Sequence, residues 1–147
     1  MSVLIQGSQL REINLGRGVE SKASGALDAS TTPSLFTITG GEVFITAMWA
    51  VVTTAITVAN TVTIQANPTT GDSAAIVSGD LGTTDTAAGT VLGTDDNAAF
   101  ARNGKPAQAV VSTGTVELDS NGTSVDGALT VYCTWVPLTD GATLVAA

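Results

Sequence analysis

The stretch FTITGGEVFITAMWAVVTTAI, residues 36–56, decides the fold of this chain. It contains a single charged residue, Glu42, and a Gly40-Gly41 pair. Such a pair suits a two-residue turn, which predicts a short strand over Ser34–Thr39 and a long hairpin partner over residues 42–52. The Val, Ile and Thr residues on either side favour pleated, half-buried surfaces, so the stretch predicts β-structure.

The predicted long strand has two apolar faces. The odd-numbered positions are Val43, Ile45, Ala47, Trp49 and Val51. The even-numbered positions are Phe44, Thr46, Met48, Ala50 and Val52. In an antiparallel sheet with one face in water, one of these sets should be polar. We therefore expect both sides of the strand to be covered, either by another copy of the chain or by loops of the same domain.

Further strands are expected wherever β-branched and aromatic residues lie between Gly, Asn and Pro turn signals. These segments are residues 57–65, 74–77, 108–112, 115–118 and 128–138. About eight short strands without a helical pattern predict an all-β fold, an antiparallel sandwich or a jelly-roll-like barrel. Residues 1–30 hold scattered apolar residues broken by glycines, so we expect an extended N-terminal arm there. The β-sandwich domain is then expected over residues 31–147.

The charge of the chain is low and uneven. The 147 residues have a formal net charge of -8, and 12% of them are charged. Residues 1–22 have a net charge of +1 through Arg11, Arg17 and Lys22, and the remaining residues have a net charge of -9. An acidic body repels phosphate, so no nucleic-acid partner is expected. The basic arm could lie on an acidic neighbour, although a chance imbalance of a few charges would look the same.

Residues that could carry out catalysis are scarce. The chain has no His, which removes the usual metal sites and catalytic triads, and we expect neither an enzyme nor a cofactor. Cys133, the single cysteine, lies in a predicted strand and fits the role of a small buried hydrophobe. Asp95, Asp96 and Asn97 could offer oxygen ligands to Ca²⁺, but they lack the EF-hand spacing and fit a solvated turn better.

The chain carries no pattern of membrane targeting. Its first residues, MSVLIQGSQLREINLG, lack the basic and long apolar regions of a signal peptide, and no run of about 18 apolar residues exists. We therefore expect no membrane partner and a protein made in the cytoplasm.

Three motifs within residues 30–71 resemble a kind of small protein encoded among the structural genes of tailed bacteriophages. They are Leu35-Phe36-Thr37-Ile38-Thr39-Gly40-Gly41, Thr53-Thr54-Ala55-Ile56 and Asn67-Pro68-Thr69-Thr70-Gly71. The resemblance lies in composition and turn pattern and covers roughly the second quarter of the chain. It implies a virion protein, and in particular a capsid decoration, or cement, protein. Such proteins commonly sit as trimers over symmetry axes of the head and brace the major capsid protein.

The resemblance implies two partners: other copies of this chain, in a homo-oligomer that we expect to be a trimer, and the phage major capsid protein. The location implied is the capsid surface of the virion, assembled in the host cytoplasm. The residues expected to build the core and the contact between copies are Val43, Ile45, Trp49, Val51 and Trp135. The arm residues expected to meet the capsid are Arg11, Arg17 and Lys22.

Two other roles remain open at this point. The chain could be a tail, baseplate or head-fibre component of the virion. It could also be a host- or carbohydrate-binding module, which would need exposed aromatic side chains. Trp49 and Trp135 are the candidate platform for a sugar, but both lie in apolar strands and fit a core or interface position better.

Overall fold

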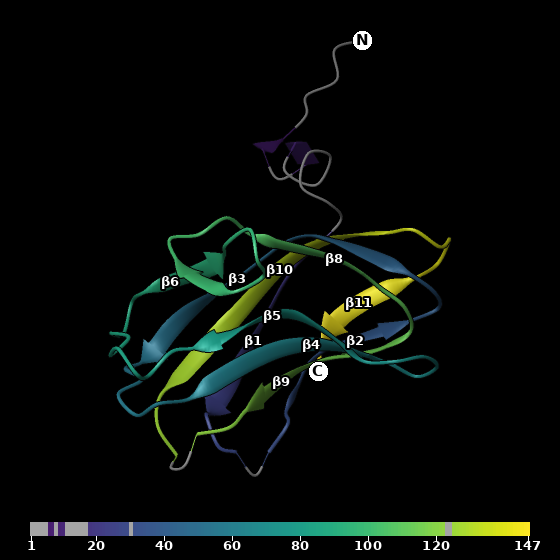
Figure 1. Cartoon of the computed structure of the whole chain (residues 1–147). Helices are drawn as coiled ribbons and strands as arrows, with labels where there is room; N and C mark the ends of the chain where they lie inside the picture. Colours follow the sequence, from purple (N-terminus) through teal and green to yellow (C-terminus); the bar gives the residue numbers. More distant parts are fainter. Residues whose placement is uncertain (1–5, 8, 11–17, 30, 123–124) are drawn as a thin grey trace.

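The computed structural model describes residues 6, 7, 9, 10, 18–29, 31–122 and 125–147. Two antiparallel β-sheets pack face to face as a sandwich (Figure 1). The expected all-β sandwich is therefore confirmed. The arrangement of the two sheets determines which side chains enter the core and which face outward.

The first sheet, sheet A, has the strand order β1-β10-β3-β6-β7. β8 also pairs with β3, on the edge that β3 shares with β6. The strands of sheet A are β1 (Gly18–Ala26), β3 (Val43–Thr54), β6 (Val91–Thr94), β7 (Phe100–Arg102), β8 (Ala107–Val111) and β10 (Ala128–Pro137). Its central pair is β3 and β10, which run alongside each other from Val43↔Pro137 to Thr54↔Ala128.

The second sheet, sheet B, has the order β11-β2-β9-β4-β5. Its strands are β2 (Ser34–Thr39), β4 (Thr61–Pro68), β5 (Ala74–Asp80), β9 (Gly114–Ser120) and β11 (Thr143–Ala146). At one rim of the sandwich β5 meets the chain before β7, where the Ser78 amide donates to the Ala98 carbonyl at 3.0 Å. At the opposite rim β1 lies beside β11.

Apart from the β4–β5 hairpin, the principal strands alternate between the two sheets along the chain. Sheet A contains the order β1-β10-β3-β8, and sheet B contains the order β2-β9-β4-β5. This is the strand order of a jelly roll. β11 is added beside β2, and β6 and β7 lie between β5 and β8 in the sequence.

The Gly40-Gly41 turn joins the two sheets and closes no hairpin. β2 lies in sheet B and β3 in sheet A, so the expected pairing of these two strands is wrong. Both glycines have positive φ, 79° and 134°, which glycine adopts without steric cost. The turn therefore carries the chain from one sheet to the other, and β2 pairs instead with β9 and β11.

The sandwich begins earlier than the expected boundary at residue 31. Gly18–Ala26 form β1, which pairs along β10 as an edge strand of sheet A. An arm of residues 1–30 is therefore too long, since the residues from Gly18 onward belong to the sandwich. The described residues before Gly18, namely Gln6, Gly7, Gln9 and Leu10, are exposed and stand apart from the two sheets (Figure 1). The expected extended form is wrong for these residues, because they form a helical turn in which the Leu10 amide donates to the Gln6 carbonyl at 3.1 Å. β6, β7 and β11 were not expected as strands, since their sequences are short and rich in Gly, Ala and Thr.

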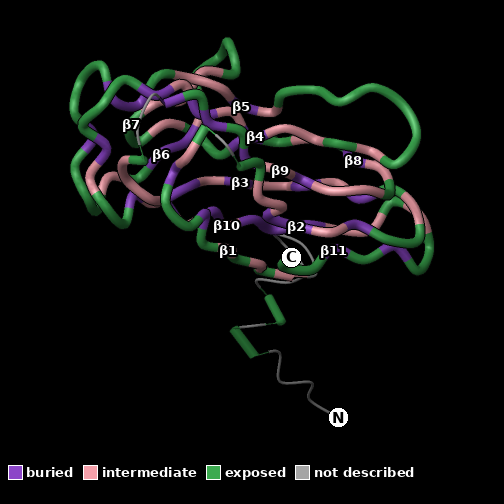
Figure 2. Tube along the Cα trace, turned by 90° about the horizontal axis from the view of Figure 1, so that it is seen from below, coloured by how far each residue is buried: buried purple, intermediate pink, exposed green. Residues whose placement is uncertain are grey.

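The hydrophobic core lies between the sheets, and exposed residues gather in the loops and on the outer surfaces (Figure 2). Alternate residues of the strands point into this layer, as the period of a β-strand requires, except where a bulge shifts the register. The largest side chains with less than 2% exposure are Phe36, Leu27, Leu35, Ile38, Ile45, Met48, Ile56, Ile64, Leu92, Leu118, Leu129 and Leu144.

Candidate interaction surface

A β-bulge in β3 decides which of its side chains face outward. The pairing of β10 with β3 shifts between Thr134↔Ala47 and Trp135↔Ile45, so Thr46 is an extra residue on β3. Such an insertion interrupts the strict alternation of faces. Val43 and Ile45 point into the core before the bulge, whereas Met48, Ala50 and Val52 do so after it.

The two expected faces of β3 are therefore each split by the bulge. Uniform alternation predicted that Trp49 and Val51 share a face with Val43 and Ile45. In the structure Trp49 and Val51 lie on the opposite side of the sheet. They lie half-buried on the outer side of sheet A together with Phe44. The expectation that β3 is apolar on both sides agrees with the structure, and the outer side is the one that the described strands leave uncovered.

The outward-facing side chains of neighbouring strands extend this apolar surface across sheet A. The strand registers place Tyr132 beside Trp49, Val136 and Val110 beside Phe44, and Val91 beside Val51. We call the surface the apolar face and define it by Val19, Phe44, Trp49, Val51, Val91, Val110, Tyr132 and Val136. Three of these valines are well exposed: Val19 by 56%, Val91 by 40% and Val110 by 63%.

Among the described residues, no charged side chain interrupts the apolar face. The outward positions of β1, β3, β8 and β10 between its members are held by small or polar uncharged residues, namely Ser21, Ala23, Thr46, Ala47, Gln108, Thr130 and Thr134. Several polar groups there already have partners: the Thr46 and Thr134 hydroxyls lie 2.7 Å apart, and the Gln108 amide donates to the Thr46 carbonyl at 2.9 Å. Because these groups already bond to one another, a partner that excludes water from them leaves their hydrogen bonds intact. The desolvation cost of binding a partner here is therefore low.

An aromatic pair occupies the middle of the apolar face. The rings of Trp49 and Tyr132, on adjacent strands, are stacked with centroids 5.6 Å apart and planes 8° from parallel. Trp and Tyr are the residues most enriched among those that dominate binding energy at protein interfaces. Since each ring already covers part of the other, the pair forms one fixed apolar ridge.

A chain crossing bounds the apolar face near β6. The segment from Asn103 to Lys105 passes over Gly93, where an added Cβ would lie 2.4 Å from the Lys105 carbonyl oxygen. Only glycine permits this approach. The crossing covers β6 beyond Val91, and the Lys105 ammonium forms an exposed ion pair with Asp96.

The outer side of sheet B has the opposite character. Its outward positions carry mostly Thr, Asn and Gln together with three carboxylates, Asp80, Glu117 and Asp119. Glu117 accepts hydrogen bonds from the Thr115 hydroxyl at 2.7 Å and the Asn67 amide at 3.0 Å. No Lys or Arg occupies an outward position of these described strands. The sandwich therefore has one uncharged apolar side and one hydrated acidic side.

β1 closes the rim of sheet A with charges directed to its inner side. Glu20 and Lys22 pair in register with the core residues Cys133 and Val131, whereas Val19, Ser21 and Ala23 face outward. Lys22 Nζ donates to the Ala147 carbonyl at the end of sheet B. Inward-directed charges on an edge strand oppose pairing with a further strand.

The structure divides the expected interface residues between two environments. Val43, Ile45 and Trp135 belong to the core, with 0%, 0% and 8% exposure. Trp49 and Val51 belong to the apolar face. Because the Trp135 indole lies over Gly18, it offers no ring surface to a sugar, and Trp49 with Tyr132 replaces it as the candidate aromatic platform.

The three cations expected to meet the capsid are also divided. Arg11 and Arg17 lie outside the described residues. Lys22 belongs to β1 and bonds to Ala147, so it is part of the sandwich and not of the arm.

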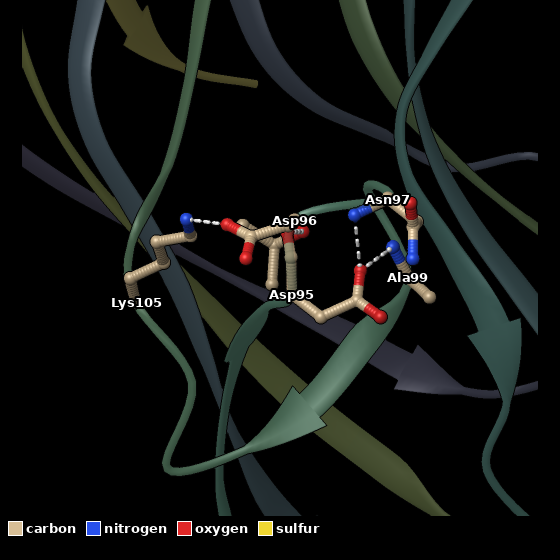
Figure 3. Close-up of polar contacts among 6 residues, drawn as sticks. Asp95, Asp96, Asn97, Ala99 and Lys105 are labelled. Carbon is tan, nitrogen blue, oxygen red and sulfur yellow. Dashed lines mark hydrogen bonds and ion pairs between the residues drawn. The ribbon is translucent and has the colours of Figure 1, made fainter.

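The acidic residues that were candidate ligands for Ca²⁺ form a capped turn (Figure 3). One carboxylate oxygen of Asp95 accepts the backbone amides of Asn97 and Ala99, at 2.7 and 2.9 Å. Asp96 forms an exposed ion pair with Lys105, and a hydrogen bond from that ammonium lowers the pKa of the Asp96 carboxyl. Among the described residues, no three His, Cys, Asp or Glu side chains gather as a possible metal site.

Two further carboxylates, those of Asp80 and Asp126, also accept hydrogen bonds from backbone amides in loops. Asp80 accepts hydrogen bonds from the Thr83 amide at 2.8 Å, the Thr83 hydroxyl at 2.7 Å and the Gly82 amide at 2.9 Å. These bonds, those of Thr83 first, lower the pKa of Asp80 to about 2. Asp126 accepts the amides of Thr57 and Val58, which lowers its pKa. These carboxylates fix loops at the ends of the strands.

The two other groups of chemical interest are also held by structural contacts. Cys133 is buried in β10, and its burial, with the nearby Glu20 carboxylate, raises the pKa of the thiol to about 12. Arg102 lines an open depression of about 430 Å³. Its guanidinium donates to the carbonyls of Thr84 and Asp85, both at 3.1 Å, and so fastens the loop before β6.

Comparisons with family models, with curated proteins and with solved structures found no match. In the described part of the chain, no helix is long and apolar enough to cross a membrane.

Proposed function

We propose that this chain is a structural protein of a tailed-bacteriophage virion that binds the outside of the assembled head and stabilises it as a decoration, or cement, protein. In this proposal several copies act together, with three as the expected number. They contact the major capsid protein and carry out no catalysis.

The observation that carries the proposal is the contrast between the two outer sides of the sandwich. The apolar face holds eight apolar side chains without a charge, including the Trp49–Tyr132 pair. An exposed apolar patch on an independent domain marks a surface that is covered in the working assembly. The acidic outer side of sheet B suits the water-facing surface of such an assembly.

The fold and the resemblance support the same function. The jelly-roll strand order occurs in viral capsid domains and in lectins, so it fits a virion protein but does not by itself identify one. The resemblance of residues 30–71 to phage structural proteins favours the virion among these possibilities.

The mechanism follows from binding equilibria. A protein that binds only the expanded shell lowers the free energy of that state by RT ln(1 + [L]/Kd), about 2.7 kcal/mol per site at a concentration 100 times Kd. Several linked copies bind through several contacts at once, so individually weak contacts give a long-lived complex. DNA packed in the head strains the seams between subunits, and bound copies that bridge a seam oppose its opening.

The arm is the part that we assign to the shell. It carries Arg11 and Arg17, while the sandwich domain is acidic. Reversal of both charges, Arg11→Glu with Arg17→Glu, should weaken binding to heads and leave the association between copies intact. Loss of that association in the double variant would contradict this assignment.

Imaging of virions tests the proposal directly. Gold-labelled antibody against this chain should decorate the heads of intact virions of the encoding phage. Label confined to the tail or baseplate would replace the proposal with the tail-component alternative.

A carbohydrate-binding role is the second candidate, and the Trp49–Tyr132 pair is the observation that favours it. Aromatic rings on an open β-sheet can stack on sugar rings. A glycan-array signal that disappears with Trp49→Ala and persists with Trp135→Phe would support this role. The acidic turn at Asp95 is not expected to contribute, since its carboxylate caps the backbone.

A further inference from the structure

We propose that the apolar face binds the apolar face of other copies of this chain, with the acidic side of sheet B turned outward. The contact would explain how copies associate in the decoration function, and its role on the head rests on that proposed function. Charge, geometry and edge protection in the described residues favour the contact itself.

The charge of the sandwich leaves the apolar face as the favourable place for two copies to meet. Residues 18–147 contain three basic and twelve acidic residues. Any approach that brings two acidic surfaces together is opposed by repulsion between like charges. Because none of the described side chains of the apolar face is charged, two such faces are compatible with one another.

Face-to-face packing also places the acidic sides as far apart as possible. Two copies joined through sheet A form four layers in the order B, A, A, B. Stacked sheets lie about 10 Å apart, so the two B sheets are separated by about 30 Å. The Debye length at physiological salt is about 8 Å, so repulsion across that distance is largely screened.

The edges of β1 and β5 offer a poorer contact between copies than the apolar face. The free edge of β1 has Glu20 and Lys22 directed to its inner side, and Lys22 is bonded to Ala147. At the other rim, β5 is joined to the segment before β7 through Ser78 and Ala98. Extension of either sheet by a strand of another copy would have to displace these contacts. These two edges are therefore less favourable places for association than the apolar face.

The size of the apolar face predicts a reversible association. From Phe44 to Val51 the face is eight residues long, and it is four strands wide, which gives a footprint of roughly 500 Å² from the strand spacings. A standard interface buries about 800 Å² on each partner. The contact should therefore be concentration-dependent in solution and strengthen on a shell that holds several copies close together.

Two matched valine substitutions test the contact. Val110→Asp introduces a carboxylate on the apolar face, and Val145→Asp introduces the same group on the outer side of sheet B. The two side chains are similarly exposed, by 63% and 51%, so both variants should fold. Val19→Asp, at a third exposed valine on the apolar face, is the second variant should Val110→Asp fail to fold.

The measurement is the molar mass of the purified full chain by sedimentation equilibrium over a range of concentrations. Wild-type chain and Val145→Asp should associate equally. Val110→Asp and Val19→Asp should lower the association constant about tenfold or more, because each places a carboxylate among apolar side chains that the contact would remove from water. Association should also persist in about 1 M salt, where charge contacts are screened to about 3 Å.

Three outcomes would overturn the inference. They are a monomeric wild-type chain at every concentration, equal loss of association in Val145→Asp and Val110→Asp, and association that disappears as salt is raised. The last result would identify a charge-driven contact instead. No heads are present in this experiment, so its failure is distinct from failure of the chain to bind heads.

Discussion

The face assignment within β3 can be tested with two adjacent valines. Val52 is 1% exposed and points into the core, whereas Val51 is half-buried on the apolar face. Val52→Ala removes two buried methyl groups, which costs about 1.6 kcal/mol in transfer free energy at about 0.8 kcal/mol per group. The cavity left behind adds to this, for a total loss of about 2–3 kcal/mol. Val51→Ala should cost less than about 1 kcal/mol in the monomer.

Urea unfolding followed by circular dichroism measures both costs. The experiments should be done at a dilution where the chain is monomeric, because Val51 lies on the surface proposed to join copies. For a chain of this size, about 2–4 °C of melting temperature corresponds to each kcal/mol, so Val52→Ala should melt about 4–12 °C below wild type. Ile45→Ala, in the core before the bulge, should cost about 2–5 kcal/mol.

The refuting result is specific. If Ile45→Ala and Val51→Ala are both costly while Val52→Ala is mild, the odd-numbered residues of β3 share one face. The assignment of a bulge at Thr46 would then be wrong, and so would the set of residues assigned to the apolar face.

Three other predictions concern close packing, pH and thiol reactivity. In thermal unfolding, Gly93→Ala should destabilise the fold by more than Gly89→Ala. The new Cβ at position 93 would lie 2.4 Å from a backbone oxygen. At position 89 the new Cβ would meet open space, and the φ of 85° costs only about 1–2 kcal/mol of backbone strain. Hydrogen bonds from Thr83 lower the pKa of Asp80 from 3.8 to about 2, so the stability that the carboxylate contributes is complete above about pH 4 and is lost as the pH falls towards 2. Asp80→Asn should remove that part of the pH dependence of stability in urea titrations. An unchanged profile would contradict the role of Asp80 as a cap. Burial raises the pKa of Cys133 to about 12, so a thiol reagent at pH 8 should label the unfolded chain and leave the folded chain unlabelled, and rapid labelling of the folded chain would contradict its burial.

The fold class could be predicted from the sequence because its strongest signals are local. The apolar runs around Ile45 and Cys133 and the Asn and Gly turn residues are enough to predict short strands and a sandwich. The β4–β5 hairpin follows from Asn67-Pro68 and Gly71-Asp72 between two strands.

The pairing of strands could not be predicted in the same way. Gly40-Gly41 has the composition of a hairpin turn, but it carries the chain between sheets, and only the long-range pairing of β2 with β9 decides between the two. The bulge at Thr46 is likewise set by the register of β10, and one inserted residue moves Trp49 and Val51 to the opposite face from Ile45.

The candidate surface was partly predictable. Two apolar sides of β3 already indicate that something covers the strand, and Trp49 and Val51 were among the residues expected at a contact. Val19 and Val110 could not be assigned to the same surface, since they are far from β3 in the sequence and join it only through β10 and β8 pairing. Arg11 and Arg17 lie outside the described residues, so their expected contact with the capsid stays a prediction.

The most direct measurement of the proposed function is a binding titration on empty heads of the encoding phage before and after expansion. Purified chain, labelled at its C-terminus away from the apolar face, is sedimented with each kind of head, and the bound copies are counted. The proposal predicts saturable binding to expanded heads at a fixed number of copies, little binding to unexpanded heads, and a higher disruption temperature for decorated heads. Equal binding to both forms, or no binding to either, would contradict the decoration function.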